Sequence, residues 1–477
     1  MKIAMVASEI NPLCKSGGLA DVVYALSKEL VVSGEEVICV LPFYKSIKDA
    51  ATLKFARVGT FTVNVGWRRV DANVYKTYID GILYYLIDNE TYFGRDSLYG
   101  YFDDGERFAF FTMAAAGLFE FVGFKPDVIH IHDWQPGMLP VVAREGLFPY
   151  VADSKFVLTI HNEAFQGMLD RYFLNDFYCL SDYLYDCGAV RFFDQVSTLK
   201  AAIVYCDKVT TVSPSHAKEL LTEVGGKGLH EVLAQKGEDF VGIVNGIDQG
   251  EWDPSSDPFI VKNYGPNAFK TAKKDCKTHL LSSFGMDVSE SKPVYGIVSR
   301  LTSQKGLGLV LSSVEGIVKR GGALVVLGSG EYDLEQAFES LHRQYPKQVG
   351  YYRGYSFQLA HDIYAGADFF LMPSLFEPCG IGQMIAERYG TLPIVRETGG
   401  LKDTVVAYRG DNPEQATGFS FADFDLGGIS YAIELAEKTM KDKKTFGTLV
   451  KNALKADHSW AKPCREYLNL YLAAIGR

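Results

Sequence analysis

Short runs of β-branched and other apolar residues alternate with helical patterns along almost the whole chain. In the first half these runs predict strands at Lys2–Ala7, Glu36–Leu41, Asp127–His132, Lys155–His161, Lys208–Ser213 and Phe240–Asn245. In the second half they predict strands at Val294–Arg300, Ala323–Gly328, Ala367–Pro373 and Leu392–Glu397. Such uniformly apolar strands are typical of parallel sheets buried on both faces, with helices as the crossovers. The pattern therefore predicts an α/β fold with doubly wound sheets.

Two segments interrupt this alternation. The stretch from Gly246 to Asn267 is rich in Asp, Pro, Gly and Asn, which is typical of a linker between domains. A region near 60–110 is rich in Tyr and Phe, and it predicts an inserted hairpin at Val70–Tyr78 and Ile82–Asp88. We therefore expect two doubly wound, Rossmann-like domains, residues 1–245 and 246–455, that face each other across a cleft.

Composition narrows the class of protein. The 477 residues are 47% hydrophobic and 22% charged, which suits a soluble globular enzyme, and the net charge of −10 argues against nucleic acid as a partner. No apolar run reaches the ~18 residues of a membrane span, and the N-terminus lacks the pattern of a signal peptide. The eight cysteines form no C-x-x-C pair. We expect a cytoplasmic protein with reduced thiols and no membrane association.

A glycine-rich loop follows the first predicted strand. Lys15-Ser16-Gly17-Gly18 precedes a helix predicted at Leu19–Leu30 by its apolar stripe. Glycines before a helix let backbone N–H groups approach an anion, and Lys15 supplies a full charge. The spacing is not that of a P-loop. Taken alone, the segment is interpreted equally well as a glycine turn with a surface lysine.

The second half of the chain carries more specific chemistry. Arg300 and Lys305 follow a strand five residues apart, where a guanidinium fork and a point charge could bind phosphate oxygens. On spacing alone, surface ion pairs are the better interpretation. After the next-but-one predicted strand, Pro378 holds Glu377 extended and Gly380 opens a helix. Gly399-Gly400 forms another loop before a helix.

Ligands of doubly wound sheets bind beyond the carboxyl ends of the strands. Four glycine-containing or cationic loops lie at such positions, in two domains. One such loop carries little information, but four together predict a phosphorylated ligand.

Two other motifs point to metals. His130-Ile131-His132-Asp133 resembles the start of a metal hydrolase site, although Trp134 and Gln135 stand where that pattern needs Asp and His. Asp423-Phe424-Asp425 resembles the metal-binding D-x-D of some sugar transferases, but capping of the following helix by an aspartate is the better interpretation. A metal-dependent hydrolase built on His130 and His132 stays a remote alternative.

A series of motifs, spread over the whole chain in one order, resembles the bacterial glycogen synthases and plant starch synthases. These motifs are Lys15-x-Gly-Gly-Leu-Ala-Asp21, Asp133-Trp134-Gln135, His161-Asn162-x-Ala164-Phe165-Gln166-Gly167, Thr211-Val212-Ser213-Pro214, Asn245-Gly246-Ile247-Asp248, Ser299-Arg300-Leu301-Thr302-x-Gln304-Lys305-Gly306, Phe376-Glu377-Pro378-Cys379-Gly380 and Thr398-Gly399-Gly400-Leu401. A tail with Trp460, Tyr467 and Tyr471 completes the resemblance.

The resemblance implies a GT-B type fold and a retaining glucosyltransferase. Such an enzyme would move glucose from ADP-glucose to the non-reducing end of an α-1,4-glucan such as glycogen, with neither a metal nor another cofactor. UDP-glucose as the donor, or a different acceptor, stays an alternative. In this picture residues 1–245 lie on the acceptor side, residues 246–455 bind the nucleotide sugar, and a C-terminal helix at 456–477 packs back on the first domain.

The resemblance also implies roles for individual residues. The implied catalytic group is Glu377, His161, Arg300, Lys305 and Asp21. Arg300 and Lys305 would neutralise the diphosphate, Glu377 would hold glucose hydroxyls, and His161 would lie near the reacting face of the sugar. The implied donor-binding residues are Lys15, Gly17, Gly18, Asn162, Asn245, Ser299, Tyr355, which would stack on the base, Cys379, Gly380, Gly399 and Gly400.

Three positions depart from the family pattern. Leu375 stands where many relatives have Arg, Glu163 stands where an apolar residue is usual, and Ile381-Gly382 replaces a more common Leu-Thr. These changes bear on donor and acceptor preference. An inactive glucan-binding relative would lack charged site residues, and none is missing here. A glycogen phosphorylase-like enzyme would need a lysine for a covalent cofactor and usually a longer chain.

Overall fold

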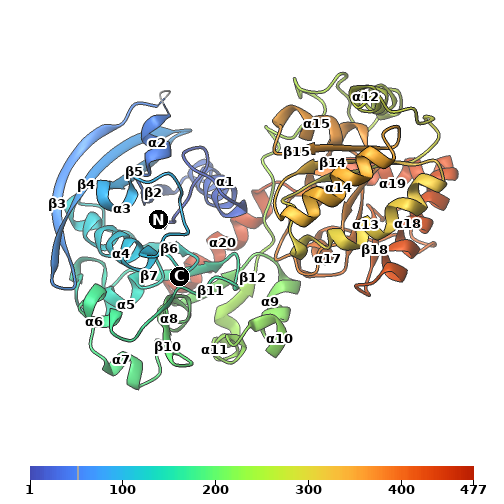
Figure 1. The fold of residues 1–477 in the computed structure, drawn as a ribbon. Helices are drawn as coiled ribbons and strands as arrows, with labels where there is room; N and C mark the ends of the chain where they lie inside the picture. Colours follow the sequence, from blue (N-terminus) through green and yellow to red (C-terminus); the bar gives the residue numbers. More distant parts are fainter. Residues whose placement is uncertain (51–52, 477) are drawn as a thin grey trace. The chain divides into compact units, whose positions relative to one another are not determined.

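The computed structural model describes residues 1–50 and 53–476, and the chain forms two compact units (Figure 1). Unit 1 comprises Met1–Ile243 together with the C-terminal segment that starts at Trp460, and unit 2 comprises Val244–Ser459. The chain therefore passes from one unit to the other at 243/244 and returns at 459/460, where the sequence predicted 245/246 and 455/456.

Unit 1 contains a nine-stranded sheet in the order β12-β11-β7-β6-β1-β2-β5-β4-β3. The strands from β12 to β5 are parallel, whereas β4 and β3 form an antiparallel edge. Because β1 lies between β2 and β6, the direction of winding reverses at β1. The strands are β1 (Lys2–Val6), β2 (Glu36–Pro42), β3 (Ala56–Val65), β4 (Arg68–Ile79), β5 (Ile82–Asp88), β6 (Val128–His132), β7 (Lys155–Ile160), β11 (Lys208–Thr211) and β12 (Phe240–Gly242).

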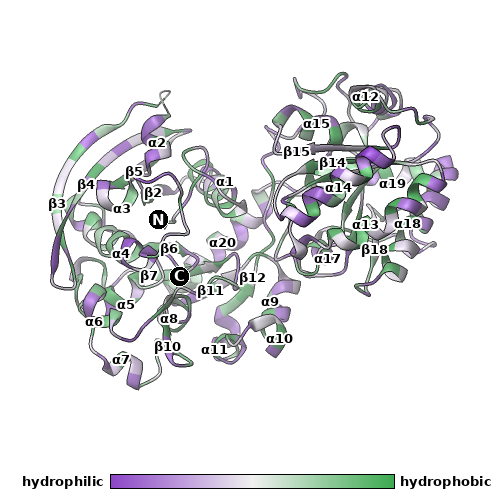
Figure 2. Ribbon diagram, in the orientation of Figure 1, coloured by the Kyte–Doolittle hydropathy of each residue, from purple (hydrophilic) through white to green (hydrophobic). Residues whose placement is uncertain are grey.

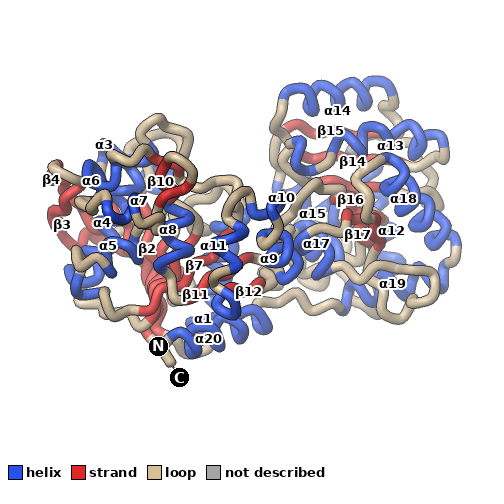
Figure 3. The backbone as a smooth tube through the Cα atoms, turned by 90° about the horizontal axis from the view of Figure 1, so that it is seen from below, coloured by secondary structure: helices blue, strands red, loops and turns tan. Residues whose placement is uncertain are grey.

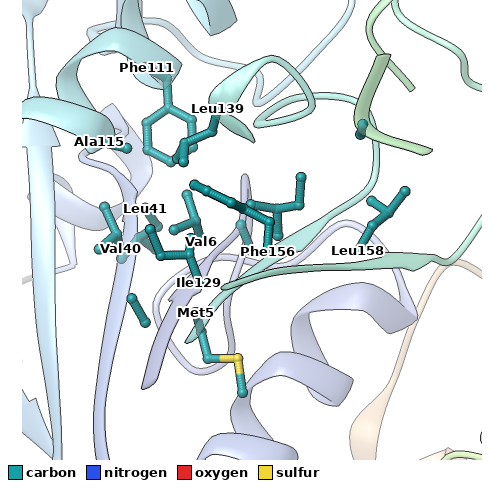
Figure 4. Close-up of a cluster of buried hydrophobic side chains, with 14 of the residues drawn as sticks. Met5, Val6, Val40, Leu41, Phe111, Ala115, Ile129, Leu139, Phe156 and Leu158 are labelled. Carbon is teal, nitrogen blue, oxygen red and sulfur yellow. The ribbon is translucent and has the colours of Figure 1, made fainter. Parts of the chain in front are cut away.

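Apolar helices cover this sheet. Phe111 and Ala115 of α4 and Leu139 of α5 pack against strand residues such as Val6 and Ile129 (Figure 4). The helices of unit 1 are α1 (Gly18–Val32), α2 (Lys45–Asp49), α3 (Glu90–Phe93), α4 (Asp104–Phe121), α5 (Leu139–Arg144), α6 (Phe173–Tyr178), α7 (Tyr183–Asp186), α8 (Thr198–Tyr205), α9 (Pro214–Leu220), α10 (Glu223–Gly226), α11 (His230–Ala234) and α20 (Ala461–Ala474). A small sheet adds β8 (Met168–Leu169), β9 (Arg191–Phe192) and β10 (Gln195–Ser197).

Unit 2 has a six-stranded parallel sheet in the order β15-β14-β13-β16-β17-β18. Helices lie on both sides of its strands (Figure 3), and helices such as α14 and α18 combine hydrophilic and hydrophobic residues (Figure 2). The strands are β13 (Val294–Val298), β14 (Ala323–Gly328), β15 (Val349–Arg353), β16 (Phe369–Met372), β17 (Leu392–Arg396) and β18 (Phe419–Phe421). The helices are α12 (Phe269–Ser283), α13 (Leu307–Lys319), α14 (Tyr332–Gln344), α15 (Phe357–Gly366), α16 (Gly382–Arg388), α17 (Gly399–Thr404), α18 (Leu426–Lys441) and α19 (Lys443–Lys455).

The segment interpreted as a linker, 246–267, forms neither a helix nor a strand, but it is not a free connection. Asp257 accepts a hydrogen bond from Tyr389 and lies 2.7 Å from His361, and the Tyr264 hydroxyl donates to the backbone of Tyr389. Trp252 stacks on His361. The segment with its Asp-Pro turns therefore packs against the rest of unit 2. The prediction of an interdomain linker of this length was wrong.

The C-terminal helix α20 belongs to unit 1, where Tyr467 and Tyr471 are fully buried. The Tyr471 hydroxyl lies 2.8 Å from His130 Nδ1, and His130 Nε2 lies 2.7 Å from the Thr159 hydroxyl. Both ring nitrogens of His130 are therefore used inside the core. A metal site built on this histidine, the remote alternative from the sequence, does not fit these contacts.

Candidate active site

The strongest candidate site of unit 2 lies at the point where the strand order of its parallel sheet reverses, between β13 and β16. Sheets of this kind bind ligands at such a point, because the loops diverge there. The loop after β13 and the loop after β16 are held together by two hydrogen bonds. Leu375 N donates to Gln304 O at 2.8 Å, and Gln304 Nε2 donates to Phe376 O at 3.2 Å. Two segments 72 residues apart in sequence thus form one edge of the site.

Lys305 and Glu377 meet at this edge. Lys305 Nζ lies 2.5 Å from Glu377 Oε2, and the Ser374 hydroxyl donates to the same oxygen at 3.0 Å. Glu377 is only 7% exposed, so its carboxylate depends on these partners for the interactions that water would otherwise provide. The sequence named Lys305 and Glu377 separately, and the structure brings them into direct contact.

Arg300 lies on the same loop but behaves differently. Its side chain is exposed, and within the described part of the chain its guanidinium has neither an ion pair nor a hydrogen bond. The neighbouring Ser299 hydroxyl donates to the Arg300 backbone carbonyl at 2.8 Å. This edge of the sheet therefore holds one cation that is paired with a carboxylate and one that is available to an anionic ligand.

Gly399 and Gly400 pack directly against the loop that carries Glu377. Gly399 has a φ of 44°, and a Cβ atom there would lie 2.0 Å from Glu377 O. A Cβ atom on Gly400 would lie 2.3 Å from Cys379 O. The backbone N–H of Gly400 already donates a hydrogen bond to Pro378 O at 3.1 Å. No larger residue fits at either position, so these glycines hold the Glu377 loop in place.

Cys379 and Asn245 lie beside this loop. Cys379 is buried, and burial raises the pKa of its thiol to about 12, so it is a neutral thiol. Asn245 hydrogen-bonds to this thiol. Its buried Oδ1 has no hydrogen-bond partner among the described residues, and such an orphan acceptor costs about 1–3 kcal/mol. A ligand that donates a hydrogen bond would relieve this cost.

Two further predicted residues of unit 2, Gly380 and Tyr355, lie in the turn before α16 and in the loop after β15. Gly380 has a φ of 74° in the turn that leads into α16, a conformation that favours glycine. Tyr355 is exposed and follows β15, which lies two strands away from β13 in the sheet. The structure therefore places Tyr355 at the same end of the sheet, after a strand two positions away from β13.

Unit 1 carries its candidate residues at its own reversal point, between β1 and β6. Lys15 Nζ lies 2.6 Å from Asp21 Oδ2, and both side chains are partly exposed. Helix α1 begins at Gly18, and Gly17 caps it without a side-chain hydrogen bond. Gly17 therefore gives the first N–H groups of this helix no side-chain cap, and the helix end favours an anion.

A pair of histidines ends the adjacent strands β6 and β7. His132 Nδ1 lies 3.0 Å from His161 Nε2, and burial lowers the pKa of His161 to about 3, so the ring is neutral at pH 7. Burial also lowers the pKa of His132. The Nε2 atom of His132 is buried without a partner among the residues that the structure describes.

Asp133 positions this histidine loop. Its Oδ1 accepts hydrogen bonds from the backbone N–H groups of His161 at 2.7 Å and Asn162 at 3.4 Å. Its own backbone is left-handed, with a φ of 58°, and burial raises the pKa of its carboxyl to about 7. The sequence analysis named His132 only in the metal-site alternative and Asp133 only as part of motifs, and it gave neither a role in glucose transfer, although both polar residues lie at or directly after the end of an apolar strand.

No group of three or more His, Cys, Asp and Glu side chains within residues 1–50 and 53–476 is arranged to hold a metal ion. Asp425 of the D-x-D segment accepts a hydrogen bond from Gly428 N at 2.8 Å and caps α18, as predicted. Among the helices of the described residues, none combines the length and the apolar character that a membrane span requires.

Comparisons with known proteins agree with this geometry. Residues 2–235 match the family model of the starch synthase catalytic domain, and residues 283–453 match that of glycosyl transferases group 1. A glycogen synthase of Anoxybacillus flavithermus is 43% identical over 99% of this chain and 97% of its own. A glycogen synthase of Clostridium botulinum is 42% identical over 99% of both chains.

Solved structures extend the comparison to the fold. The catalytic domain of starch synthase IV from Arabidopsis thaliana, bound to ADP and acarbose, matches with a TM-score of 0.93 and 32% identity over 100% of this chain and 99% of that one. Sucrose-phosphate synthase from Thermosynechococcus elongatus matches with a TM-score of 0.64 at 16% identity over 100% of this chain and 99% of that one, which shows a shared fold alone.

Proposed function

The chain belongs to the family of bacterial glycogen synthases and plant starch synthases, and from this premise we propose that it transfers glucose from ADP-glucose to the non-reducing end of an α-1,4-glucan with retention of configuration. The observation that carries the proposal is the loop pair of unit 2, in which Lys305, Glu377 and Ser374 converge beside an unpaired Arg300. The ADP in the starch synthase IV structure supports an adenosine diphosphate leaving group.

In the proposed reaction, Arg300 and Lys305 stabilise the diphosphate as it leaves. An oxocarbenium-like transition state transfers negative charge to the leaving group, and fixed cations are most effective where charge develops. Glu377 binds hydroxyls of the donor glucose, and Lys305 is its ion-pair partner in the free protein. Because these two cations supply the counter-charge, we propose that the reaction needs no metal and no other cofactor.

The remaining predicted residues complete the proposal. His161 lies near the reacting face of the glucose, and its neutral ring avoids placing a second positive charge beside the oxocarbenium-like sugar. Lys15 and the first N–H groups of α1 bind donor oxygens from unit 1, with Asp21 as the ion-pair partner of Lys15 in the free protein. The further donor-binding residues are Gly17, Gly18, Asn162, Asn245, Ser299, Tyr355, Cys379, Gly380, Gly399 and Gly400.

Asn245 and Gly400 have more definite roles within this proposal. The orphan Oδ1 of Asn245 accepts a hydrogen bond from the donor. Gly400, whose N–H is already used, acts by letting its backbone approach Cys379 and so fixing the position of Glu377. The eight cysteines are all free, which fits the proposed cytoplasmic location of the protein.

The proposal is tested by transfer of labelled glucose to glycogen from ADP-glucose and UDP-glucose side by side. We expect a higher kcat/KM with ADP-glucose and an α-linked product. A several-fold preference for UDP-glucose would overturn the donor assignment. Absence of transfer from both donors would overturn the proposed reaction.

A further inference from the structure

The short loop after β14, residues 329–331, lies against the loop after β13, residues 299–306, which carries both cations of the candidate site. Leu301 and Gly330 form an isolated parallel β-bridge between the two loops. A Cβ atom on Gly330 would lie 2.2 Å from Leu301 O, so a glycine is needed for this close approach. Glu331 N donates a hydrogen bond to Leu301 O at 2.7 Å. The two loops are therefore joined backbone to backbone.

The side chain of Glu331 adds a second connection. Its Oε1 accepts a hydrogen bond from Ser303 N at 2.8 Å, and its Oε2 accepts one from the Ser303 hydroxyl at 2.5 Å. Ser303 begins a 3-10 turn that ends at Lys305, and Thr302, which precedes the turn, gives it no side-chain cap. Glu331 therefore supplies, from another loop, the capping acceptor that the turn lacks. The hydrogen bonds from the hydroxyl and the backbone of Ser303 lower the pKa of Glu331.

A second carboxylate, that of Glu335 on α14, holds the loop after β14 from its other side. Its Oε1 accepts a hydrogen bond from Gly330 N at 2.9 Å, and its Oε2 lies 2.5 Å from a guanidinium nitrogen of Arg353. Glu335 is buried, and Arg353 is the last residue of β15, two residues before Tyr355. The loop that carries Glu331 is thus fixed between the loop after β13 and the end of β15.

These contacts give Glu331 more influence on position than on folding. The residue is exposed, and substitutions at exposed positions change folding stability little. The turn that it caps, however, ends at Lys305, whose ammonium must lie where the candidate site uses it. On the far side of the same turn, Gln304 is hydrogen-bonded to the loop that carries Glu377. Glu331 is therefore a contact that can fix the turn without touching a ligand.

We infer that Glu331 is a positioning residue for glucose transfer, which acts through Ser303 to hold the loop that carries Arg300 and Lys305. This inference rests on the proposed function, because that function supplies the diphosphate that the two cations meet. Without the Glu331 carboxylate both cations would still be present, but they would be less well preorganised for the charge that develops on the leaving group.

Initial rates with ADP-glucose and glycogen, together with titration calorimetry of ADP, test this role. Glu331→Ala should lower kcat/KM and the affinity for ADP by about tenfold each, less than the ~100-fold expected for loss of a cation itself, because both cations remain. Glu331→Gln, whose amide oxygen can still accept a hydrogen bond from Ser303, should stay within about threefold of the wild type. The matched control is Glu339→Ala, also on α14, whose ion pair with Arg343 stays within that helix, and it should behave as the wild type does.

A double-mutant cycle tests whether Glu331 acts through Ser303. Ser303→Ala removes the hydroxyl but keeps the backbone N–H, so alone it should lower kcat/KM by only about threefold. In the Glu331→Ala background the same substitution should cause no further loss, since its partner is already missing. Losses that multiply in the double variant would overturn the inference, because Glu331 would then act on the ligand directly.

The other outcomes separate this inference from the proposed function. If the wild type transfers glucose and the folded Glu331→Ala protein keeps its kcat/KM and its ADP affinity, Glu331 does not position the loop. Equal losses in Glu331→Ala and Glu331→Gln would also contradict the inference, because the charge and not the contact with Ser303 would then matter. If the wild type transfers no glucose from either donor while Glu331→Ala binds ADP about tenfold more weakly, the positioning role stands and the proposed reaction fails.

Discussion

Substitutions at Arg300 and Lys305 should affect activity alike but stability differently, because only Lys305 has a buried ion-pair partner. Replacing Lys305 by Ala leaves the Glu377 carboxylate with Ser374 alone. Removing one member of a buried ion pair costs about 3–5 kcal/mol. We take about 3 kcal/mol, the lower end, since the Lys305 side chain is 18% exposed and the serine bond survives. For a unit of this size, about 2–4 °C per kcal/mol gives a fall of about 6–12 °C in the unfolding midpoint of unit 2.

Arg300→Ala removes a charge that has no partner to lose. Its effect on stability should stay within about 0.5 kcal/mol, the range for surface substitutions. Both variants should nevertheless lower kcat/KM for ADP-glucose by at least ~100-fold, the scale for removing one preorganised charge contact. Lys319→Ala, an exposed lysine on α13 that pairs with Glu315, is the control and should change neither quantity.

Differential scanning calorimetry and initial-rate assays on the same preparations measure both effects. The double variant Lys305→Ala/Glu377→Gln should recover most of the lost stability, because no uncompensated charge is left, and it should stay inactive. A Lys305→Ala protein as stable as Arg300→Ala would refute the reasoning about the buried pair. Near-normal turnover of a folded Arg300→Ala protein would show that the diphosphate binds elsewhere.

Two further predictions concern the same site. Transfer should survive EDTA, because Arg300 and Lys305 supply the counter-charge; loss of activity that Mg²⁺ restores would show that this assignment is wrong. Gly400→Ala should lower activity strongly and stability by about 1–3 kcal/mol, since a Cβ atom 2.3 Å from Cys379 O must displace the Glu377 loop. Gly410→Ala, at a glycine with open space around it but a φ of 100°, controls for backbone strain alone, and equal activity losses in the two variants would contradict the steric argument.

The sequence predicted the strands that are buried on both faces, because an uninterrupted apolar run is visible without any partner. It missed β3, β15 and β18 for physical reasons. β3 is an edge strand with mostly exposed positions, so its pattern is polar, and β18 has only three residues. In β15, Tyr352 and Arg353 are exposed at the sheet's edge. The hairpin at 70–88 was predicted as an insertion, but β5 pairs in parallel with β2 and extends the main sheet.

In the candidate site too, some features could be predicted from the sequence and others could not. Glu377, Lys305 and Arg300 could be named from their place after strands, and the family resemblance gave each an expected role. The contact between Lys305 and Glu377 could not be derived, since it depends on how two loops 72 residues apart are joined at Gln304. Gly400 was named as a donor-binding residue from the resemblance, and the structure uses its N–H inside the loop. A sequence shows which polar groups could bind a ligand, but not which of them already have a partner within the protein.

Glu163, one of the residues that depart from the family pattern, anchors the histidine loop through a buried ion pair. It is 2% exposed, and its carboxylate lies 3.3 Å from His216 Nε2 and 3.2 Å from Lys227 Nζ. Despite burial, these partners lower the pKa of Glu163. Burial opposes protonation of His216, but its contacts with Glu163 and Glu219 outweigh burial and raise its pKa. His216 sits on α9 and Glu163 two residues after His161, so the pair fastens the loop to a neighbouring helix.

This pair should make the stability of unit 1 depend on pH in a defined way. The raised pKa of His216 gives stabilisation that is complete below about pH 6.5 and is lost as the pH rises through the folded-state pKa. The lowered pKa of Glu163 gives stabilisation that is present above about pH 4.3 and is lost as the pH falls through its folded-state pKa. Glu163→Gln should therefore cost most, about 1–3 kcal/mol, between these limits. Above the pKa of His216 a smaller cost should persist, because Lys227 stays charged.

This pH dependence of the cost of Glu163→Gln is checked by the unfolding midpoints of the wild type and the variant, measured from pH 4 to 9. His216→Asn is the matched variant, and it should flatten the same profile while leaving the interaction with Lys227. The loop also carries Asn162, a predicted donor-binding residue, so kcat/KM should follow the same pH trend in the wild type and lose it in Glu163→Gln. A stability difference that stays constant from pH 5 to 9 would mean that His216 is not charged in the folded protein and that Lys227 alone holds the loop.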